Sequence, residues 1–80
     1  SFIKGFSISI STPMLSPAFR EGMIKTIKAN KGNVPLTMFL YDPEKKWNIE
    51  FLSRKFKVAV TAEFIAQLEK MGIKYNVIKK

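Results

Sequence analysis

The sequence predicts a single α+β domain of ferredoxin-like topology. Its element order is β-α-β-β-α-β, and a four-stranded antiparallel sheet carries both helices on one face. Three observations lead to this prediction. Four segments alternate apolar and polar residues with the period of a strand. Two others place apolar residues three and four apart, between a capping residue and a glycine, as a helix does. A tight turn joins two of the strands into a hairpin.

The hairpin is the strongest strand signal in the chain, and it occupies Val34–Arg54. Its two alternating apolar sets are Val34, Leu36, Met38 and Leu40, and then Trp47, Ile49 and Phe51. The turn between them is Asp42-Pro43-Glu44-Lys45, with Asp at the first position and Pro at the second, where its fixed φ is favourable. Two strands alone are only marginally stable in water, so the rest of the chain must cover them.

The first strand is predicted where Phe6, Ile8 and Ile10 alternate with serines. It ends at Thr12-Pro13, because Pro cannot donate a hydrogen bond to a neighbouring strand.

The first helix begins at Ser16-Pro17, with Ser as N-cap and Pro at the first helical position. Its apolar stripe comprises Phe19, Met23, Ile24 and Ile27, and its remaining surface carries Arg20, Lys25, Lys28 and Lys31. Gly22 in the helix interior costs about 1 kcal/mol relative to Ala, and either a close approach to the sheet or chance would explain it. Gly32 is predicted as the left-handed residue that ends the helix.

After the hairpin, residues 53–60 form an extended basic connector whose Val58 and Val60 add a short strand segment. A second helix starts at Thr61 and ends at Gly72, and a last strand follows. The second hairpin strand is expected to be central, between the first hairpin strand and the first strand of the chain. The predicted core is Phe6, Ile8, Ile10, Phe19, Met23, Ile27, Leu36, Met38, Leu40, Trp47, Ile49, Phe51, Phe64, Leu68, Ile73, Tyr75 and Val77.

The composition restricts the possible chemistry. The chain of 80 residues is one small domain with 46% hydrophobic residues, which is ordinary for a globular protein. It has no Cys and no His, so disulfides, zinc-thiolate sites, thiol nucleophiles and the commonest general base are excluded. This composition fits a cytoplasmic protein, and no apolar run approaches the ~18 residues of a membrane span. Because the first residue is Ser, we expect a piece of a longer chain, or a processed or tagged one.

Catalysis is not expected in this segment. Its carboxylates are Glu21, Asp42, Glu44, Glu50, Glu63 and Glu69, and none of them converge in the predicted fold as a two-metal site requires. The sequence has neither a dinucleotide-binding glycine motif nor a phosphate-binding loop. We therefore expect no catalytic residue, no metal ligand and no cofactor in this fragment.

The net charge of +8 allows two interpretations. It favours an anionic partner, either nucleic acid or an acidic protein surface. It also fits a solvated basic surface, because the lysines are spread along the chain.

The open face of the predicted sheet is the main candidate site. It should carry Ser7, Ser9, Ser11, Thr37, Phe39, Tyr41, Asn48, Glu50, Leu52, Lys74 and Asn76. Phe39 and Tyr41 could stack on bases while lysines contact phosphates. However, the basic-Gly-aromatic RNA-binding motif is absent, and Glu50 would repel phosphate. The alternative is an apolar patch of Phe39, Tyr41 and Leu52 that docks another domain or subunit.

One stretch resembles a known family. GNVPLTMFLYDPEKKWNIEFLSRKFKVAVTAEFIAQLEKMGIKYNV is similar to the extreme C-terminal domain of the bacterial replicative DNA polymerase III alpha subunit, in wording closest to the Bacteroides-type branch. The shared features are a helix ending in N-K-G-N before a strand, an I-x-F-x-S-R-x-x-x-V strand and connector, and a T-x-E-x-I-x-x-L helix. The resemblance covers about residues 5–78, and its motifs belong to the scaffold.

The resemblance implies a parent chain that is a DNA-directed DNA polymerase, a nucleotidyltransferase whose catalytic aspartates lie far upstream. An oligonucleotide-binding barrel would precede this domain, and the parent chain would contact DNA. In the family, the C-terminal region contacts the tau subunit of the clamp loader, so tau or other polymerase III holoenzyme subunits are the expected partners. No membrane partner is expected.

The candidate partner-binding or nucleic-acid-binding residues are Phe39, Tyr41, Leu52 and Lys74 on the open face and Arg20, Lys25, Lys28 and Lys31 on the basic helix.

Three functions follow from these observations. The first is a non-catalytic interaction domain of a replicative polymerase that docks tau or neighbouring domains. The second is an independent single-stranded nucleic-acid-binding domain, whose affinity would fall steeply with salt. The third is a regulatory domain of the same topology that dimerises around a small molecule.

Overall fold

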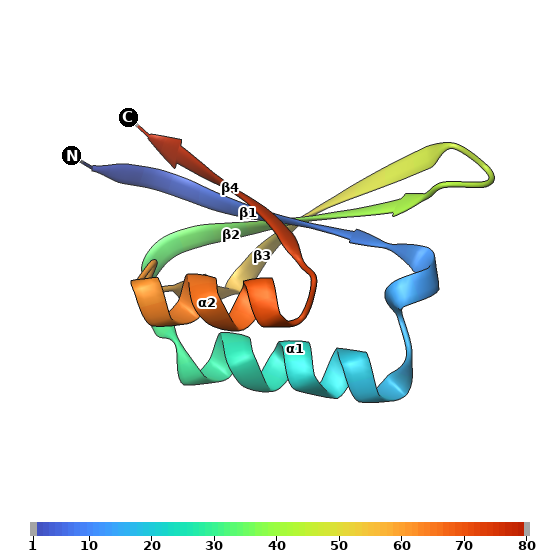
Figure 1. Ribbon diagram of the computed structural model, residues 1–80. Helices are drawn as coiled ribbons and strands as arrows, with labels where there is room; N and C mark the ends of the chain where they lie inside the picture. Colours follow the sequence, from blue (N-terminus) through green and yellow to red (C-terminus); the bar gives the residue numbers. More distant parts are fainter. Residues whose placement is uncertain (1, 80) are drawn as a thin grey trace.

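The computed structural model describes the backbone of residues 2–79 and the side chains of residues 2–49 and 56–79. In chain order the elements are β1 (Ile3–Ser11), a short 3-10 turn η1 (Thr12–Met14), α1 (Pro17–Ala29), β2 (Lys31–Asp42), β3 (Trp47–Val58), α2 (Ala62–Lys70) and β4 (Lys74–Lys79). Figure 1 shows one sheet with both helices on the same face. The predicted α+β class, the order of the elements and the placement of the helices are confirmed.

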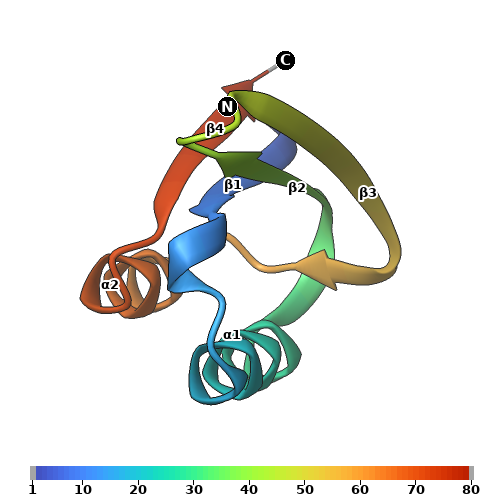
Figure 2. The ribbon, with the colours of Figure 1, turned by 90° about the vertical axis from the view of Figure 1, so that its right-hand side faces the viewer.

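The order of strands in the sheet differs from the prediction. It is β3-β2-β1-β4, with β1 parallel to β2 and the other two pairs antiparallel. The sheet is therefore mixed, and the expected fully antiparallel, ferredoxin-like arrangement with β3 in the centre is wrong. Helix α1 returns the chain so that β2 lies directly beside β1, in a β-α-β unit with no strand between them. Figure 2 shows β3 on the side of α1 and β4 above α2.

The edge position of β3 has a physical reason in its sequence. This strand contains Glu50, Arg54, Lys55 and Lys57, and charged residues of this kind are typical of edge strands. At an edge such charges stay near water, and they also oppose unwanted pairing with other strands. In contrast, β2 brings Leu36, Met38 and Leu40 into register with the apolar residues Phe6, Ile8 and Ile10 of β1.

Both predicted N-caps of the helices are confirmed. The Ser16 hydroxyl accepts a hydrogen bond from the Phe19 N–H at 3.0 Å, with Pro17 at the first position of α1. The Thr61 hydroxyl accepts from the Phe64 N–H at 3.1 Å at the start of α2. Each hydroxyl satisfies one backbone donor that has no partner within the helix.

The end of α2 is a Schellman motif around Gly72, whose φ is 72°. The Ile73 N–H donates to the Leu68 carbonyl and the Gly72 N–H donates to the Glu69 carbonyl, both at 3.0 Å. Leu68 and Ile73 are both buried, as the apolar contact of this motif requires. The predicted stop at Gly72 is confirmed.

Gly32 has a different role from the predicted one. Helix α1 ends at Ala29, β2 already begins at Lys31, and the φ of Gly32 is not positive. The prediction of a left-handed cap is therefore wrong. The Ala59 N–H donates to the Asn30 carbonyl at 2.8 Å, and this brings the two chain segments together. A Cβ atom at Gly32 would lie 2.5 Å from the Ala59 nitrogen, so this crossing requires a residue without a side chain.

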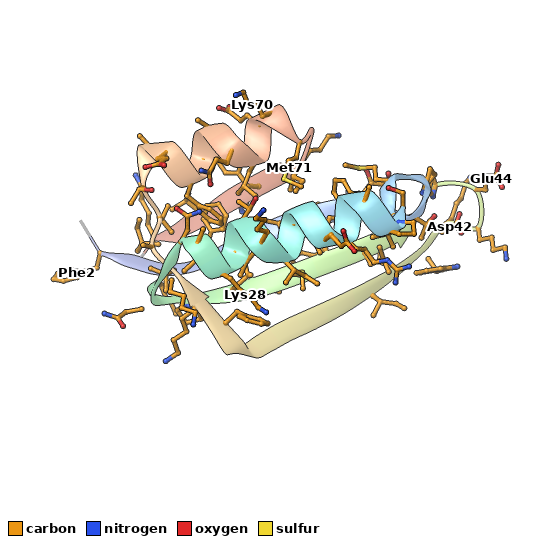
Figure 3. All side chains as sticks on the ribbon, turned by 90° about the horizontal axis from the view of Figure 1, so that it is seen from below. Phe2, Lys28, Asp42, Glu44, Lys70 and Met71 are labelled. Carbon is orange, nitrogen blue, oxygen red and sulfur yellow. The ribbon has the colours of Figure 1, made fainter. Side chains whose placement is uncertain are left out.

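Gly22 lies at the contact between the two helices. A Cβ atom there would meet the Met71 Cε at 3.5 Å, so the expected close approach to the sheet is wrong. The Thr26 hydroxyl lies 3.8 Å from the Met71 sulfur, and the Asn30 Nδ2 donates to the Gln67 Oε1 at 2.8 Å. In Figure 3 Met71 lies at the end of α2 that is next to α1. Positions 22, 26 and 30 therefore form the side of α1 that faces α2.

The hairpin turn follows its sequence signal. The Asp42 Oδ1 accepts from the Glu44 N–H at 2.9 Å and from the Lys45 N–H at 3.0 Å. The Lys46 N–H donates to the Asp42 carbonyl at 2.8 Å, and Lys46 takes the left-handed φ of 57° that closes the turn.

The core lies between the sheet and the helices. Its buried residues are Phe6, Ile8, Ile10, Met23, Ile27, Leu36, Val58, Phe64, Leu68 and Ile73. The ring of Phe6 contacts those of Phe64 and Tyr75, with centroids 5.4 Å and 5.7 Å away. Val58 was not predicted to be in this core, and the predicted member Phe51 lies outside the described side chains. Three other predicted members, Trp47, Ile49 and Tyr75, are exposed.

Candidate functional site

The open face of the sheet carries the predicted aromatic pair. Phe39 and Tyr41 alternate with Leu36, Met38 and Leu40, which face the helices, so both rings belong to the opposite face. Both side chains are half-buried. Because Ser9 pairs with Phe39 on one side and with Lys74 on the other, the exposed Lys74 lies in the same row as Phe39.

The next row of the open face is small and polar. It consists of Asn76, Ser7 and Thr37, and Ser7 is only 5% exposed because it lies between larger neighbours on a central strand. Leu52 is in register with Thr37, but its side chain lies outside the described residues. The structure therefore brings together Phe39, Tyr41 and Lys74, and places the backbone of Leu52 beside them.

Three of the four predicted basic residues lie on the helix layer of the molecule. Arg20, Lys25 and Lys28 are exposed on α1, and Lys31 is exposed at the start of β2 rather than at the end of the helix. Since α1 covers the face of the sheet opposite Phe39 and Tyr41, the basic residues and the aromatic pair form two separate surfaces.

One side of α1 has no helix beside it. Gly22, Thr26 and Asn30 face α2, and on a helix the mean direction of Arg20, Ile24 and Lys28 lies about 160° from theirs. Ile24 keeps 44% of its surface exposed. Figure 3 shows Lys28 on the side of α1 that faces β3. We call Arg20, Ile24 and Lys28 the outer flank of α1.

A second apolar surface was missed by the sequence analysis. Figure 1 shows the hairpin of β2 and β3 extending past the N-terminal end of α1. On its helix-facing side, Met38 and Leu40 of β2 are half-buried, whereas Trp47 and Ile49 of β3 are 37% and 43% exposed. We call these four residues the hairpin apolar face.

The exposure of this surface follows from the lengths of the elements. The 13 residues of α1 span about 20 Å at ~1.5 Å each. The 12 residues of β2 span about 40 Å at ~3.3 Å each. The helix therefore cannot cover the whole strand. Period-two alternation identifies the face of the sheet on which Trp47 and Ile49 lie. It does not show how much of that face the helix covers. A comparison of the predicted lengths of helix and strand indicates that part of the hairpin stays uncovered.

An apolar cavity of about 120 Å³ lies between the sheet and the N-terminal half of α1. It is lined by Ile10, Leu15, Met23, Met38, Phe39 and Leu40. A cavity lined by these residues has no polar group to orient a reacting substrate, so it fits the packing of apolar side chains better than chemistry.

The described part of the chain offers no other chemical centre. Among its side chains, no three His, Cys, Asp or Glu residues gather where they could hold a metal ion. Asp42, the last residue of β2 before the hairpin turn, accepts hydrogen bonds from the backbone of that turn. Neither described helix is long and apolar enough to cross a membrane.

Comparison with protein-family models identifies the family of this chain. The family model described as DNA polymerase III alpha subunit, C-terminal domain, matches residues 6–78. A search of curated proteins finds no match.

Proposed function

The chain belongs to the family of C-terminal domains of the DNA polymerase III alpha subunit, and from this premise we propose that it is a non-catalytic docking domain of a replicative polymerase. Its partner is the tau subunit of the clamp loader or a neighbouring domain of the polymerase, and it acts in the bacterial cytoplasm. Its contribution to replication is to hold the polymerase in the replisome, whereas nucleotide transfer belongs to residues of the parent chain outside this segment.

One observation carries this proposal: the β2–β3 hairpin projects from the body, and it carries large apolar residues on both of its faces. Trp47 and Ile49 lie on the helix-facing side, and Phe39 and Tyr41 lie on the open side. Isolated exposed apolar residues are common, but contiguous ones on a projecting element are typical of a protein interface. Trp and Tyr are also the residues that most often dominate the binding energy of interfaces.

The test compares the two faces of the hairpin. Binding of the C-terminal region of tau to the chain is measured by calorimetry for the double variants Trp47→Ala/Ile49→Ala and Phe39→Ala/Tyr41→Ala. We expect at least one of them to bind at least about tenfold more weakly, since each removes two large contacts. Ile78→Ala is the control, because Ile78 is similarly exposed, at 41%, but lies on β4. Wild-type affinity in both double variants would overturn the proposal.

A second candidate function is single-stranded nucleic-acid binding. It is favoured by the row that places Lys74 beside Phe39, together with the net charge of +8. In that case the affinity for a single-stranded oligonucleotide falls steeply as salt increases, because bound lysines release counterions from the phosphates. Phe39→Ala would weaken binding through the loss of base stacking. Binding that does not depend on salt would argue against this function.

A further inference from the structure

The outer edge of β3 is an open end of the sheet. β3 is the last strand in the order β3-β2-β1-β4, and in the described backbone it pairs only with β2. From Trp47 to Ser53 the pairing with β2 is in continuous register. Over this run, the backbone N–H and C=O groups that point away from β2 have no strand to bind. Such a row is a ready template for another extended chain.

On the helix-facing side, the surroundings of this edge are apolar and basic, whereas Glu50 of the same run is in register with Phe39 of the open face. Trp47 and Ile49 are exposed on the helix-facing side of β3, and the outer flank of α1 adds Ile24 between Arg20 and Lys28. In the described part of the chain, neither Arg20 nor Lys28 is joined to a carboxylate by an ion pair. Both charges are therefore available to a ligand.

The charge of the chain decides which kind of strand fits. A second copy of this chain would bring another net charge of +8 and another β3 with Arg54, Lys55 and Lys57 in its sequence. Like charges at an edge oppose such pairing. An acidic strand is attracted by the positive electrostatic field of the chain, and this attraction also increases its association rate.

We propose that the outer edge of β3 accepts an extended acidic segment of a partner protein as an added strand. The backbone of the segment pairs with β3 between Trp47 and Ser53. Its apolar side chains, at every second position, lie beside Trp47 and Ile49 on the helix-facing side. Its carboxylates are attracted by the cations of the outer flank, Arg20 in the first turn of α1 and Lys28 in the last.

This inference rests on the proposed docking function and specifies the chemistry of the partner. The docking function requires only a partner protein, whereas this inference requires a partner segment that is extended and acidic. A globular partner that merely covers the hairpin would satisfy the proposed function without satisfying this inference.

The first experiment uses defined peptides as probes. A fluorescent peptide of about eight residues that alternates valine and glutamate is titrated with the chain, and anisotropy is recorded. Two control peptides replace the glutamates with lysines or place a proline at the centre. We expect the acidic peptide to bind at least about tenfold more tightly than either control, since lysines are repelled and proline cannot complete a strand. Equal affinities, or no binding of the acidic peptide, would overturn the inference.

Two matched pairs of variants locate the site. Ile49→Glu and Ile78→Glu introduce the same charge at similarly exposed positions on the two edge strands. Lys28→Gln and Lys25→Gln remove the same charge from α1, on its outer flank and on its solvent side. We expect the first member of each pair to weaken the acidic peptide severalfold more than the second. Equal effects within both pairs would show that the peptide responds only to overall charge, and would overturn the inference.

Amide hydrogen exchange provides a measurement that needs no variant. On addition of the acidic peptide, amides of residues 47–53 that do not donate to β2 should become protected, because an added strand accepts their hydrogen bonds. Protection confined to β4 or to the helices would place the peptide elsewhere and overturn the inference. If tau binds normally while the acidic peptide does not, the docking function stands and only the added strand is wrong. If neither binds, both fail.

Discussion

Leu40 and Ile49 lie directly opposite each other in the β2–β3 ladder, yet their surroundings differ. Leu40 packs against the core, whereas Ile49 is 43% exposed. The two residues share one face of the sheet, but the helices cover only the part nearer the centre. Ile49 thus has the residue type of a core position without its burial, which is typical of a residue that contacts another molecule.

The first prediction separates stability from binding at this position. Ile49→Thr keeps a β-branched side chain at an exposed site, so the free energy of unfolding should change by no more than about 0.5 kcal/mol. Leu68→Ala is the comparison, because Leu68 is fully buried and its truncation should cost about 2–5 kcal/mol. Urea denaturation of both variants measures the two values. A cost for Ile49→Thr similar to that for Leu68→Ala would show that Ile49 is part of the core.

The second prediction concerns two glycines with opposite expectations. Gly32→Ala should destabilise the domain by about 1–3 kcal/mol or more, because its Cβ would meet backbone atoms of Val58 and Ala59 at 2.5–2.6 Å. Gly22→Ala should stabilise it by about 0.5–1 kcal/mol, because alanine is a better helix former. The new Cβ meets only the flexible end of Met71, at an ordinary 3.5 Å. Thermal denaturation of the two variants should therefore shift in opposite directions, and equal shifts would contradict this explanation.

The third prediction uses the two residues with positive φ. Gly72→Ala should cost about 1–2 kcal/mol, because a side chain is strained at φ 72° in the Schellman motif. Lys46→Gly should remove a comparable strain at φ 57° in the hairpin turn. The greater flexibility of glycine in the unfolded chain offsets part of this gain, so the net change should lie between zero and about 1 kcal/mol of stabilisation. Chemical denaturation checks both signs, and a destabilised Lys46→Gly variant would contradict the second.

The fourth prediction concerns the polar contact between the helices. The Asn30 Nδ2 donates to the Gln67 Oε1 and to the Thr26 carbonyl, both at 2.8 Å. A double-mutant cycle of Asn30→Ala and Gln67→Ala should give a coupling energy of about 0.5–1.5 kcal/mol, the usual net value of a hydrogen bond. A coupling energy indistinguishable from zero would mean that water replaces this contact without loss.

The sequence predicts individual elements well because their signals are local. Ser16 and Thr61 cap the two helices and Gly72 ends the second, each through chemistry that depends on neighbouring residues only. The order of strands is not local. The alternation in β2 and β3 identifies which residues share a face, but it does not determine which strand lies beside β1. The charged residues of β3 favour an edge position over a central one. They are the feature of the sequence that distinguishes the observed strand order from the predicted order.

The candidate site was predictable in part. The structure places Phe39, Tyr41 and Lys74 on the open face as predicted, because alternation within a strand determines the face. Their role in binding stays a prediction. The spacing of Trp47 and Ile49 is that of buried residues and predicts core positions for both. Only the relative lengths of helix and strand reveal that α1 is too short to cover the whole of the hairpin, which leaves both residues partly exposed.

The central claim is that this domain docks a protein through its projecting hairpin. The most direct measurement is an NMR titration of the isotope-labelled chain, first with single-stranded DNA and then with the C-terminal region of tau. We predict that tau shifts the resonances of Trp47, Ile49 and their neighbours on the hairpin, while DNA leaves them unchanged. Shifts with DNA alone, centred on Phe39, Tyr41 and Lys74, would contradict the claim and establish a nucleic-acid-binding domain.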